Sequence, residues 1–223
     1  MESIIKDIIC SSILAAGRIT KQQHAFIIKH STTTNLLEST YDWTISLSNR
    51  NPVDVLYIDF SKAFDSVVHS KLTLKLRQIC LPDLLIPWIT AFLTDRSQQV
   101  KIENVVSHIS KVISGVLGPI LFIIYVNDLE DVLSNKATFK LFADELKLYS
   151  SFDIPSSYVN LPHALDLLVL WSTSWQLSIN QSITQLLHLG PSQNVYFYHI
   201  YGNNIMSTNK VLDLGVMTDS DLS

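Results

Sequence analysis

Two short acidic segments, each at the end of an apolar run, constrain the fold of this chain most. The first spans residues 55–65 and the second residues 139–149. In each segment, apolar and aromatic residues typical of a buried strand lead directly into a carboxylate, Asp59 or Asp144. A carboxylate at the end of a buried strand costs free energy unless something compensates its charge. Two converging carboxylates can hold divalent metal against a phosphate-bearing substrate, so the pattern predicts metal-assisted phosphoryl transfer.

Composition and charge limit the remaining choices. The 223 residues are 47% hydrophobic, which is enough for a sizeable core in one large domain. The net charge of −4 argues against strong nonspecific binding to nucleic acid, because phosphate contacts need clustered Lys and Arg. The nearest approach to a basic cluster, Lys71, Lys75 and Arg77, is typical of a solvated helix face. Two cysteines, Cys10 and Cys80, and the lack of a membrane-spanning segment predict an intracellular protein of the cytoplasm or nucleus.

Hydrophobic periodicity predicts a mixture of helices and strands. The expected helices span residues 1–14, 31–48, 66–80, 84–93, 117–133 and 161–179. The expected strands span residues 53–60, 98–102, 110–113, 137–142, 146–149, 185–189, 194–201 and 210–216. Residues 137–142 and 146–149 form a predicted hairpin with Asp144 and Glu145 at its tip. Because helices and strands alternate irregularly, the sequence favours the α+β class over a doubly wound parallel sheet.

The segments around these acids resemble the reverse transcriptases of non-LTR retrotransposons, the jockey-like and related LINE elements. The most specific match is Asp59-Phe60-Ser61-Lys62-Ala63-Phe64-Asp65, which is similar to polymerase motif A. The other matches are to the family's Gln-His-Gly-Phe segment of the fingers, both flanks of motif B, motif C, motif D and the strand near the primer grip, at residues 23–37, 114–122, 142–145, 171–190 and 213–216. The resemblance covers nearly the whole chain.

The resemblance implies a right-hand polymerase fold of the α+β class. An antiparallel palm sheet backed by helices is expected, with partial fingers and a thumb that is absent or only begun. The implied divisions are partial fingers at 1–52, a palm with motifs A to D at 53–190, and the end of the palm with primer-grip-like strands at 191–223. The implied activity is RNA-directed DNA synthesis, with an RNA template, a DNA primer and deoxynucleoside triphosphates as partners.

The resemblance also implies the site residues. Two Mg²⁺ ions, with Mn²⁺ as a substitute, are expected on the catalytic acids and on one backbone carbonyl: Asp59, Asp144, Glu145 and the carbonyl of Phe60. The Phe60 ring is expected near the sugar of the incoming nucleotide, and Ser114 and Gly115 are expected to contact substrate. Asp65 is expected to anchor the turn into the next helix instead of binding metal.

Three departures from the family predict impaired catalysis in a truncated copy. A Pro-Gln-Gly-Ser stretch of motif B is missing between Val116 and Leu117, and a misplacement of about 1 Å can cost roughly a hundredfold in rate. Glu145 replaces the family's second Asp, and its extra methylene moves the carboxylate, which Mg²⁺ tolerates badly. Ile183 stands where the family has a Lys that could protonate the leaving pyrophosphate.

Two other functions stay open at this point. One is a noncatalytic palm fragment that binds nucleic acid or a partner protein. The other is an unrelated metal-dependent phosphohydrolase, which would need further ligands, and His69, His108 and His163 lack the spacing for that. The sequence leaves the oligomeric state open.

Overall fold

The computed structural model describes residues 2–15, 17–79, 81–82, 84–94, 97–99, 101–103, 105–108, 110–111, 117–152, 157–191 and 196–222. The chain contacts divide it into two compact units. Unit 1 combines residues 1–19 with 62–127, and unit 2 combines residues 20–61 with 128–223. Unit 1 is therefore largely an insertion in the sequence of unit 2. The division into fingers, palm and end of palm stays a prediction.

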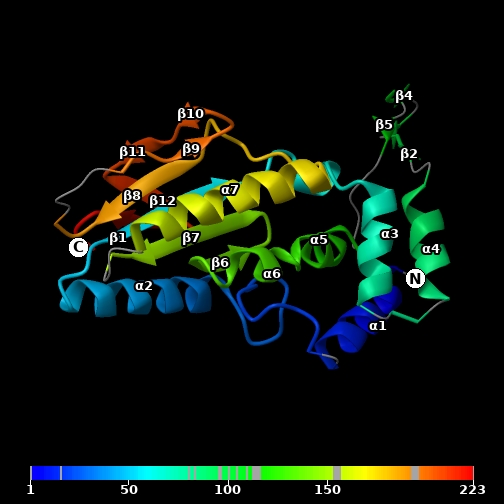
Figure 1. Ribbon diagram of the computed structural model, residues 1–223. Helices are drawn as coiled ribbons and strands as arrows, with labels where there is room; N and C mark the ends of the chain where they lie inside the picture. The colour runs from blue at the N-terminus through cyan, green and yellow to red at the C-terminus, as the bar shows by residue number, and fades with distance from the viewer. Residues whose placement is uncertain are drawn as a thin grey trace. The chain divides into compact units, whose positions relative to one another are not determined.

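Unit 1 is mainly helical. Helix α3 packs against both α4 and α5 (Figure 1). Strands β2 and β5 pair with each other, and so do β3 and β4. The elements of this unit are α1 (Glu2–Ala15), the 3-10 turn η1 (Ala63–Asp65), α3 (His69–Gln78), α4 (Leu85–Leu93), α5 (Gly118–Val126), β2 (Ser97–Gln98), β3 (Lys101–Ile102), β4 (Val105–Val106) and β5 (Ser110–Lys111).

Unit 2 is built on a five-stranded sheet in the order β11-β8-β1-β7-β6. The strands are β1 (Val53–Asp59), β6 (Thr138–Phe142), β7 (Glu145–Ser151), β8 (Gln185–Leu189) and β11 (Met206–Thr208). All neighbours are antiparallel except β11, which runs parallel to β8. The α+β class with an antiparallel-dominated sheet is confirmed, and the central strand β1 is the one that carries Asp59.

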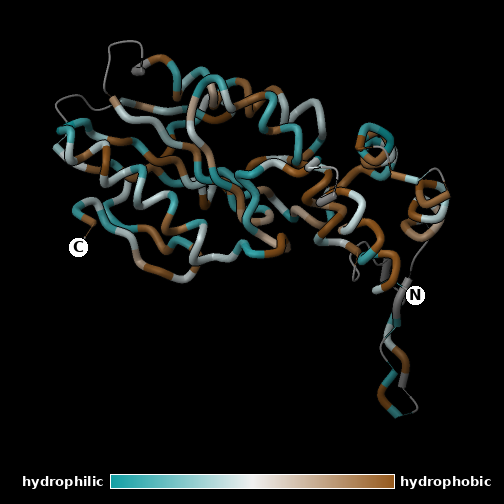
Figure 2. Tube along the Cα trace, turned by 90° about the horizontal axis from the view of Figure 1, so that it is seen from below, coloured by the Kyte–Doolittle hydropathy of each residue, from teal (hydrophilic) through white to brown (hydrophobic). Residues whose placement is uncertain are grey.

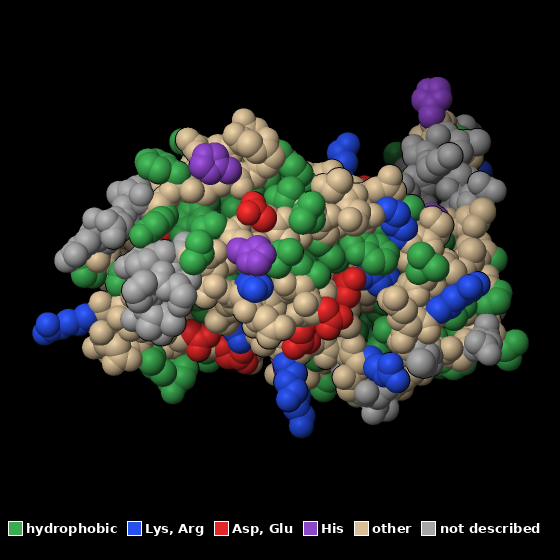
Figure 3. Space-filling model, viewed as in Figure 1, with side chains coloured by type: hydrophobic (Ala, Val, Ile, Leu, Met, Phe, Trp, Pro, Cys, Tyr) green, Lys and Arg blue, Asp and Glu red, His purple; other side chains and the backbone are tan. Residues whose placement is uncertain are grey.

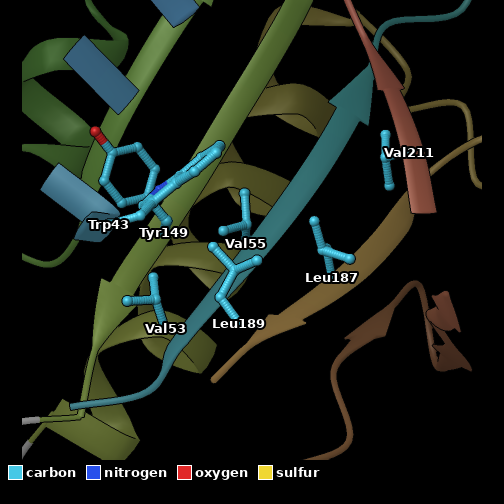
Figure 4. Close-up of a cluster of buried hydrophobic side chains, with 7 residues drawn as sticks. All are labelled: Trp43, Val53, Val55, Tyr149, Leu187, Leu189 and Val211. Carbon is cyan, nitrogen blue, oxygen red and sulfur yellow. The ribbon is translucent and has the colours of Figure 1, made fainter. Parts of the chain in front are cut away.

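Helix α2 (Thr32–Ser48) covers one face of this sheet. It begins after Ser31, whose side chain accepts a hydrogen bond from the Thr34 backbone N–H. The Thr34 hydroxyl oxygen in turn accepts one from the Ser31 backbone N–H. The helix inserts Trp43, 1% exposed, whose ring meets Tyr149 edge-on with centroids 5.8 Å apart. Figure 4 shows how strands β1, β7, β8 and β12 (Lys210–Asp213) contribute to the same apolar cluster: Trp43, Val53, Val55, Tyr149, Leu187, Leu189 and Val211.

The opposite face lies under α7 (Ser157–Trp175) and carries a buried polar network. Asp54 is 3% exposed and lies directly opposite His188 in the register of β1 and β8. Its carboxylate accepts a hydrogen bond of 2.5 Å from His188 Nδ1 and one of 2.6 Å from the Tyr198 hydroxyl. The Asp54 carboxylate raises the pKa of His188, although burial lowers it. The ion pair therefore ties β8 and the segment at Tyr198 to the central strand.

This network makes the stability of the chain depend on pH. Because the pKa of His188 is higher in the folded chain than its unfolded value of about 6.5, the pair stabilises fully below pH ~6.5 and loses this contribution as the pH rises through the folded pKa. Urea midpoints from pH 6 to 9 for the natural chain and for His188→Asn should converge as the pH rises. A difference that is constant over this range would contradict the charged pair. Burial lowers the pKa of His24 to about 4, so its contribution to stability is lost as the pH falls from ~6.5 toward 4 and overlaps the tested range only at its lower end.

Five predicted elements differ from the structure. The strand expected at 98–102 is split into β2, which pairs with β5, and β3, which pairs with β4. The helix expected at 117–133 is two helices, α5 and α6 (Leu129–Leu133), interrupted at Asn127 and Asp128. The Asn127 side chain donates to the Arg18 carbonyl, and Asp128 accepts from Trp171 Nε1. The strand expected at 210–216 is a hairpin of β12 (Lys210–Asp213) and β13 (Val216–Asp219). Helix α7 ends at Trp175, and the strand expected at 194–201 is reduced to β9 (His199–Ile200), paired with β10 (Asn203–Asn204), within the described residues.

No helix among the described residues is long and apolar enough to cross a bilayer. Along the trace in Figure 2, hydrophobic and hydrophilic residues alternate over short distances, as is typical of elements with one buried face.

Candidate active site

The two acidic segments meet at one end of the unit 2 sheet. Asp59 is the last residue of β1, and Glu145, the first of β7, lies directly opposite it. Strands β6 and β7 are joined by Ala143 and Asp144, and Ala143 has a positive φ of 56°. The predicted hairpin is confirmed, but its turn lies one residue earlier than expected. Glu145 therefore belongs to the strand and Asp144 to the turn, and both acids adjoin Asp59.

Burial raises the pKa of all three carboxylates, and charge repulsion adds to the effect in two of them. Partial burial raises the pKa of Asp59, Asp144 and Glu145. The charge of Asp144 raises the pKa of Asp59 and of Glu145 further. In the described residues, no Lys or Arg forms an ion pair with any of the three, so the negative charge is left for an external cation to compensate.

The acid-bearing turn rests on a glutamine for which the sequence predicted no such structural role. Gln23 is fully buried, and its Oε1 accepts hydrogen bonds from the backbone N–H groups of Ala143 (3.1 Å) and Ala25 (2.9 Å). The neighbouring backbone pairs with β6, because His24 N–H donates to the Leu141 carbonyl at 2.9 Å. The segment that resembles the family's Gln-His-Gly-Phe motif thus supports the turn of motif C.

Gln23→Leu should destabilise the chain by about 1–3 kcal/mol, because two buried N–H groups lose their acceptor. Urea unfolding measures the change. Gln22→Leu is the matched control, since the Gln22 Oε1 atom is buried and without a hydrogen-bond partner, and its removal should cost little. Equal losses for both variants would contradict the role given to Gln23.

A cavity of about 430 Å³ adjoins the acids. Its lining includes Asp59 and Glu145, and also Ile183, which is 51% exposed and supplies no proton donor. Lys147 and Asp213 line the same cavity and form an ion pair of 2.9 Å. The cavity gives the two strand-end acids a shared space in which a charged substrate or cation can be bound.

Phe60 follows Asp59 in the sequence, but its side chain lies on the opposite face of the sheet, under α7. Its ring is 1% exposed and packs on Trp171 with centroids 6.0 Å apart. This placement argues against the predicted contact between the ring and a nucleotide sugar. The Phe60 backbone carbonyl is placed differently from the ring. The β-bridge between Phe60 and Ile179 uses the Asp59 carbonyl and the Ser61 N–H, so no described backbone N–H donates to the Phe60 carbonyl.

The remaining predicted site residues are only partly described. Ser114 and Gly115 lie outside the described residues, so their contact with substrate stays a prediction. Asp65 is exposed in η1, and its N–H donates to the Lys62 carbonyl. Within the described ranges, no group of three or more His, Cys, Asp and Glu side chains is arranged to hold a metal ion. Carboxylate and carbonyl oxygens are the ligands that a hard divalent cation prefers, and the metal ligands implied by the resemblance stay a prediction.

Basic residues do not gather on the face drawn in Figure 3. Lys and Arg side chains stand singly or in small groups there. This agrees with the net charge of −4 and with the scatter expected from the sequence.

Comparison with protein families identifies the family of the chain. The model described as "Reverse transcriptase (RNA-dependent DNA polymerase)" matches residues 1–217. The chain belongs to the reverse transcriptase family.

Curated relatives of this reverse transcriptase domain come from mobile elements of flies. The RNA-directed DNA polymerase of the jockey element of Drosophila melanogaster is 24% identical over 79% of this chain and 21% of its own length. That of Drosophila funebris is 25% identical over the whole chain and 26% of its own length. A probable RNA-directed DNA polymerase of the X-element is 27% identical over 81% of this chain. The reverse transcriptase domain thus spans about a quarter of these proteins or less.

Solved structures show the same fold. Apo telomerase from Candida tropicalis, truncated from its C-terminal domain, matches 98% of this chain and 44% of its own with a TM-score of 0.66 and 10% identity. Telomerase from Candida albicans, in complex with a fragment of telomeric RNA, covers 98% of this chain and 38% of its own with a TM-score of 0.64 and 11% identity. The reverse transcriptase domain therefore has the right-hand polymerase fold of telomerase.

Proposed function

We propose that Asp59, Asp144 and Glu145, with the Phe60 carbonyl, bind divalent metal for RNA-directed DNA synthesis, and that this chain performs the reaction slowly. The single observation that carries the proposal is the register of β1 and β7, which sets Asp59 directly opposite Glu145 and beside Asp144. The expected partners are an RNA template, a DNA primer and deoxynucleoside triphosphates, which belong to the interior of the cell.

The chemistry is nucleotidyl transfer. The 3′-oxygen of the primer forms a bond to the α-phosphorus, the bond from that phosphorus to the pyrophosphate oxygen breaks, and the 3′-hydroxyl proton passes to solvent. Mg²⁺ or Mn²⁺, when bound, supplies positive charge to the attacking and leaving oxygens. The role of the three carboxylates is to bind that charge at the sheet end. Their raised pKa values support this role, because a bound cation would offset the cost of keeping the three carboxylates charged.

Two features of the described site predict a low rate. The Glu145 carboxylate extends one methylene further into the cavity than an Asp would, so the ligand oxygens are displaced. Ile183 contributes an alkyl wall to the same cavity and cannot protonate pyrophosphate.

Glu145→Asp should raise primer extension about tenfold or more, because a displaced ligand of about 1 Å can cost up to roughly a hundredfold in rate. The measurement is incorporation of dTTP on poly(rA)/oligo(dT) with Mg²⁺ or Mn²⁺. Glu103→Asp, an exposed Glu to Asp change in unit 1, is the matched control and should change nothing.

Two results would change the proposal. Robust incorporation by the natural chain, abolished by Asp59→Ala, would overturn the statement that it works slowly. No incorporation by either the natural chain or Glu145→Asp, together with a salt-dependent gel shift on primer-template, would instead support the noncatalytic nucleic-acid-binding fragment.

A further inference from the structure

The cavity beside the acids contains a buried ion pair that the proposed reaction does not use. Lys147 and Asp213 are 4% and 2% exposed, and Lys147 Nζ lies 2.9 Å from Asp213 Oδ2. The two residues are 66 positions apart, on β7 of the sheet and on β12 of the hairpin. Taking both charges out of water is costly, so this pair calls for a functional explanation.

The pair lies next to the acids on the same face of the sheet. In the register of β1 and β7, Lys147 is opposite Tyr57, and Glu145 is opposite Asp59. Successive residues on one face of a strand are roughly 6 to 7 Å apart, which the long side chain of Lys147 can span. Without Asp213, the carboxylates of Glu145 and Asp59 would be the next partners within its reach.

A second lysine, on the neighbouring strand, repels the ammonium group of Lys147. Lys140 of β6 lies directly opposite Lys147, and like charges in that position repel each other. Lys140 is held by Glu38 at 2.5 Å, as Lys147 is held by Asp213. Each lysine of this cross-strand pair therefore has its own acid partner from outside the β1, β6 and β7 strands.

We infer that Lys147 and Asp213 are a positioning pair for the acid site: Asp213 keeps the ammonium group off Glu145 and Asp59, and the same contact docks the β12–β13 hairpin on the sheet. Val211 of that hairpin packs in the Trp43 cluster, and the Tyr57 side chain faces Asp213. The expected effect on metal binding rests on the proposed function. The docking of the hairpin is independent of it.

Binding of Mn²⁺, followed by electron paramagnetic resonance on the full chain, tests the electrostatic role. Asp213→Asn should lower the affinity about tenfold, because the freed ammonium then competes with the metal for the acids. Lys147→Met should leave the affinity equal or higher. The double variant removes both charges and should return to within about threefold of the natural chain. Lys29→Met and Asp221→Asn, both exposed in unit 2, are the matched charge controls.

Opposite effects of the two single variants distinguish positioning from mere structural support. Equal losses of affinity in both would overturn the electrostatic role, since a loosened fold weakens the site whichever charge is removed.

Hydrogen exchange of the metal-free chain tests the docking separately. Amides of β12 and β13 should exchange about tenfold faster in each single variant than in the natural chain, because one buried charge is then unpaired. In the double variant their exchange should be slower than in either single variant. Unchanged exchange in both single variants would overturn the docking role. If the natural chain binds no Mn²⁺, the proposed metal site is wrong, and the exchange result alone decides the inference.

Discussion

Asp59→Asn should lower the affinity of the chain for Mn²⁺ by about a hundredfold or more and remove templated nucleotide incorporation. Asp59 supplies the β1 half of the acid pair, and its partners Asp144 and Glu145 both come from the β6–β7 hairpin. An amide keeps the shape but loses the charge, and loss of even an outer partner of a metal ligand typically costs 10–100-fold. Electron paramagnetic resonance of Mn²⁺ and primer extension measure the two effects.

Asp65→Asn is the matched control for that change. Asp65 belongs to the same motif, but it lies exposed in η1 of unit 1, and its N–H caps the turn at Lys62. Metal affinity should therefore be unchanged within about twofold, as for surface substitutions elsewhere. A comparable loss in both variants would show that the predicted choice of Asp59 as ligand is wrong.

Asp54→Ala should cost about 3–5 kcal/mol of unfolding free energy, because it leaves the His188 ring and the Tyr198 hydroxyl without their shared buried acceptor. Urea unfolding followed by tryptophan fluorescence measures the loss. Asp166→Ala removes an exposed carboxylate from α7 and should stay within about 0.5 kcal/mol of the natural chain.

A double variant separates the net contribution of the Asp54 network to stability from the penalty for leaving one buried charge unpaired. Asp54→Leu with His188→Leu replaces the ion pair by apolar side chains and should lose much less than Asp54→Ala, since no charge is left buried and unpaired. If the double variant is as unstable as the single one, the loss comes from packing and the hydrogen bonds contribute little.

Local patterns predicted the two elements that carry the acids. The strand ending at Asp59 and the hairpin carrying Asp144 and Glu145 both depend on residues that are close in sequence, and the structure confirms both elements. The turn was misplaced by one residue because Ala143, and not a Gly or Asn, adopts the positive φ. The same reason hid the hairpin at Leu214 and Gly215, where a leucine has a φ of 48°.

The polar contacts that support the site could not be predicted in this way. Gln23 reaches Ala143 across 120 positions, and Tyr198 reaches Asp54 across 144. Such partners are brought together by strand register and by helix packing, and neither follows from the spacing of charged residues in the sequence. A buried acid within an apolar run, as at Asp54, was the one available signal, and it does not name its partner.

The strand order has a consequence for how this chain folds during its synthesis on the ribosome. Val53 in β1 pairs with Ser151 on one side and with Leu189 on the other, so the central strand is made long before either neighbour. All of unit 1 from residue 62 to 127 is synthesised in between. The unpaired backbone edges and the apolar side chains of β1 thus stay open to wrong partners during translation. The yield of folded chain in a cell should therefore depend on holdase chaperones more than its equilibrium stability would indicate.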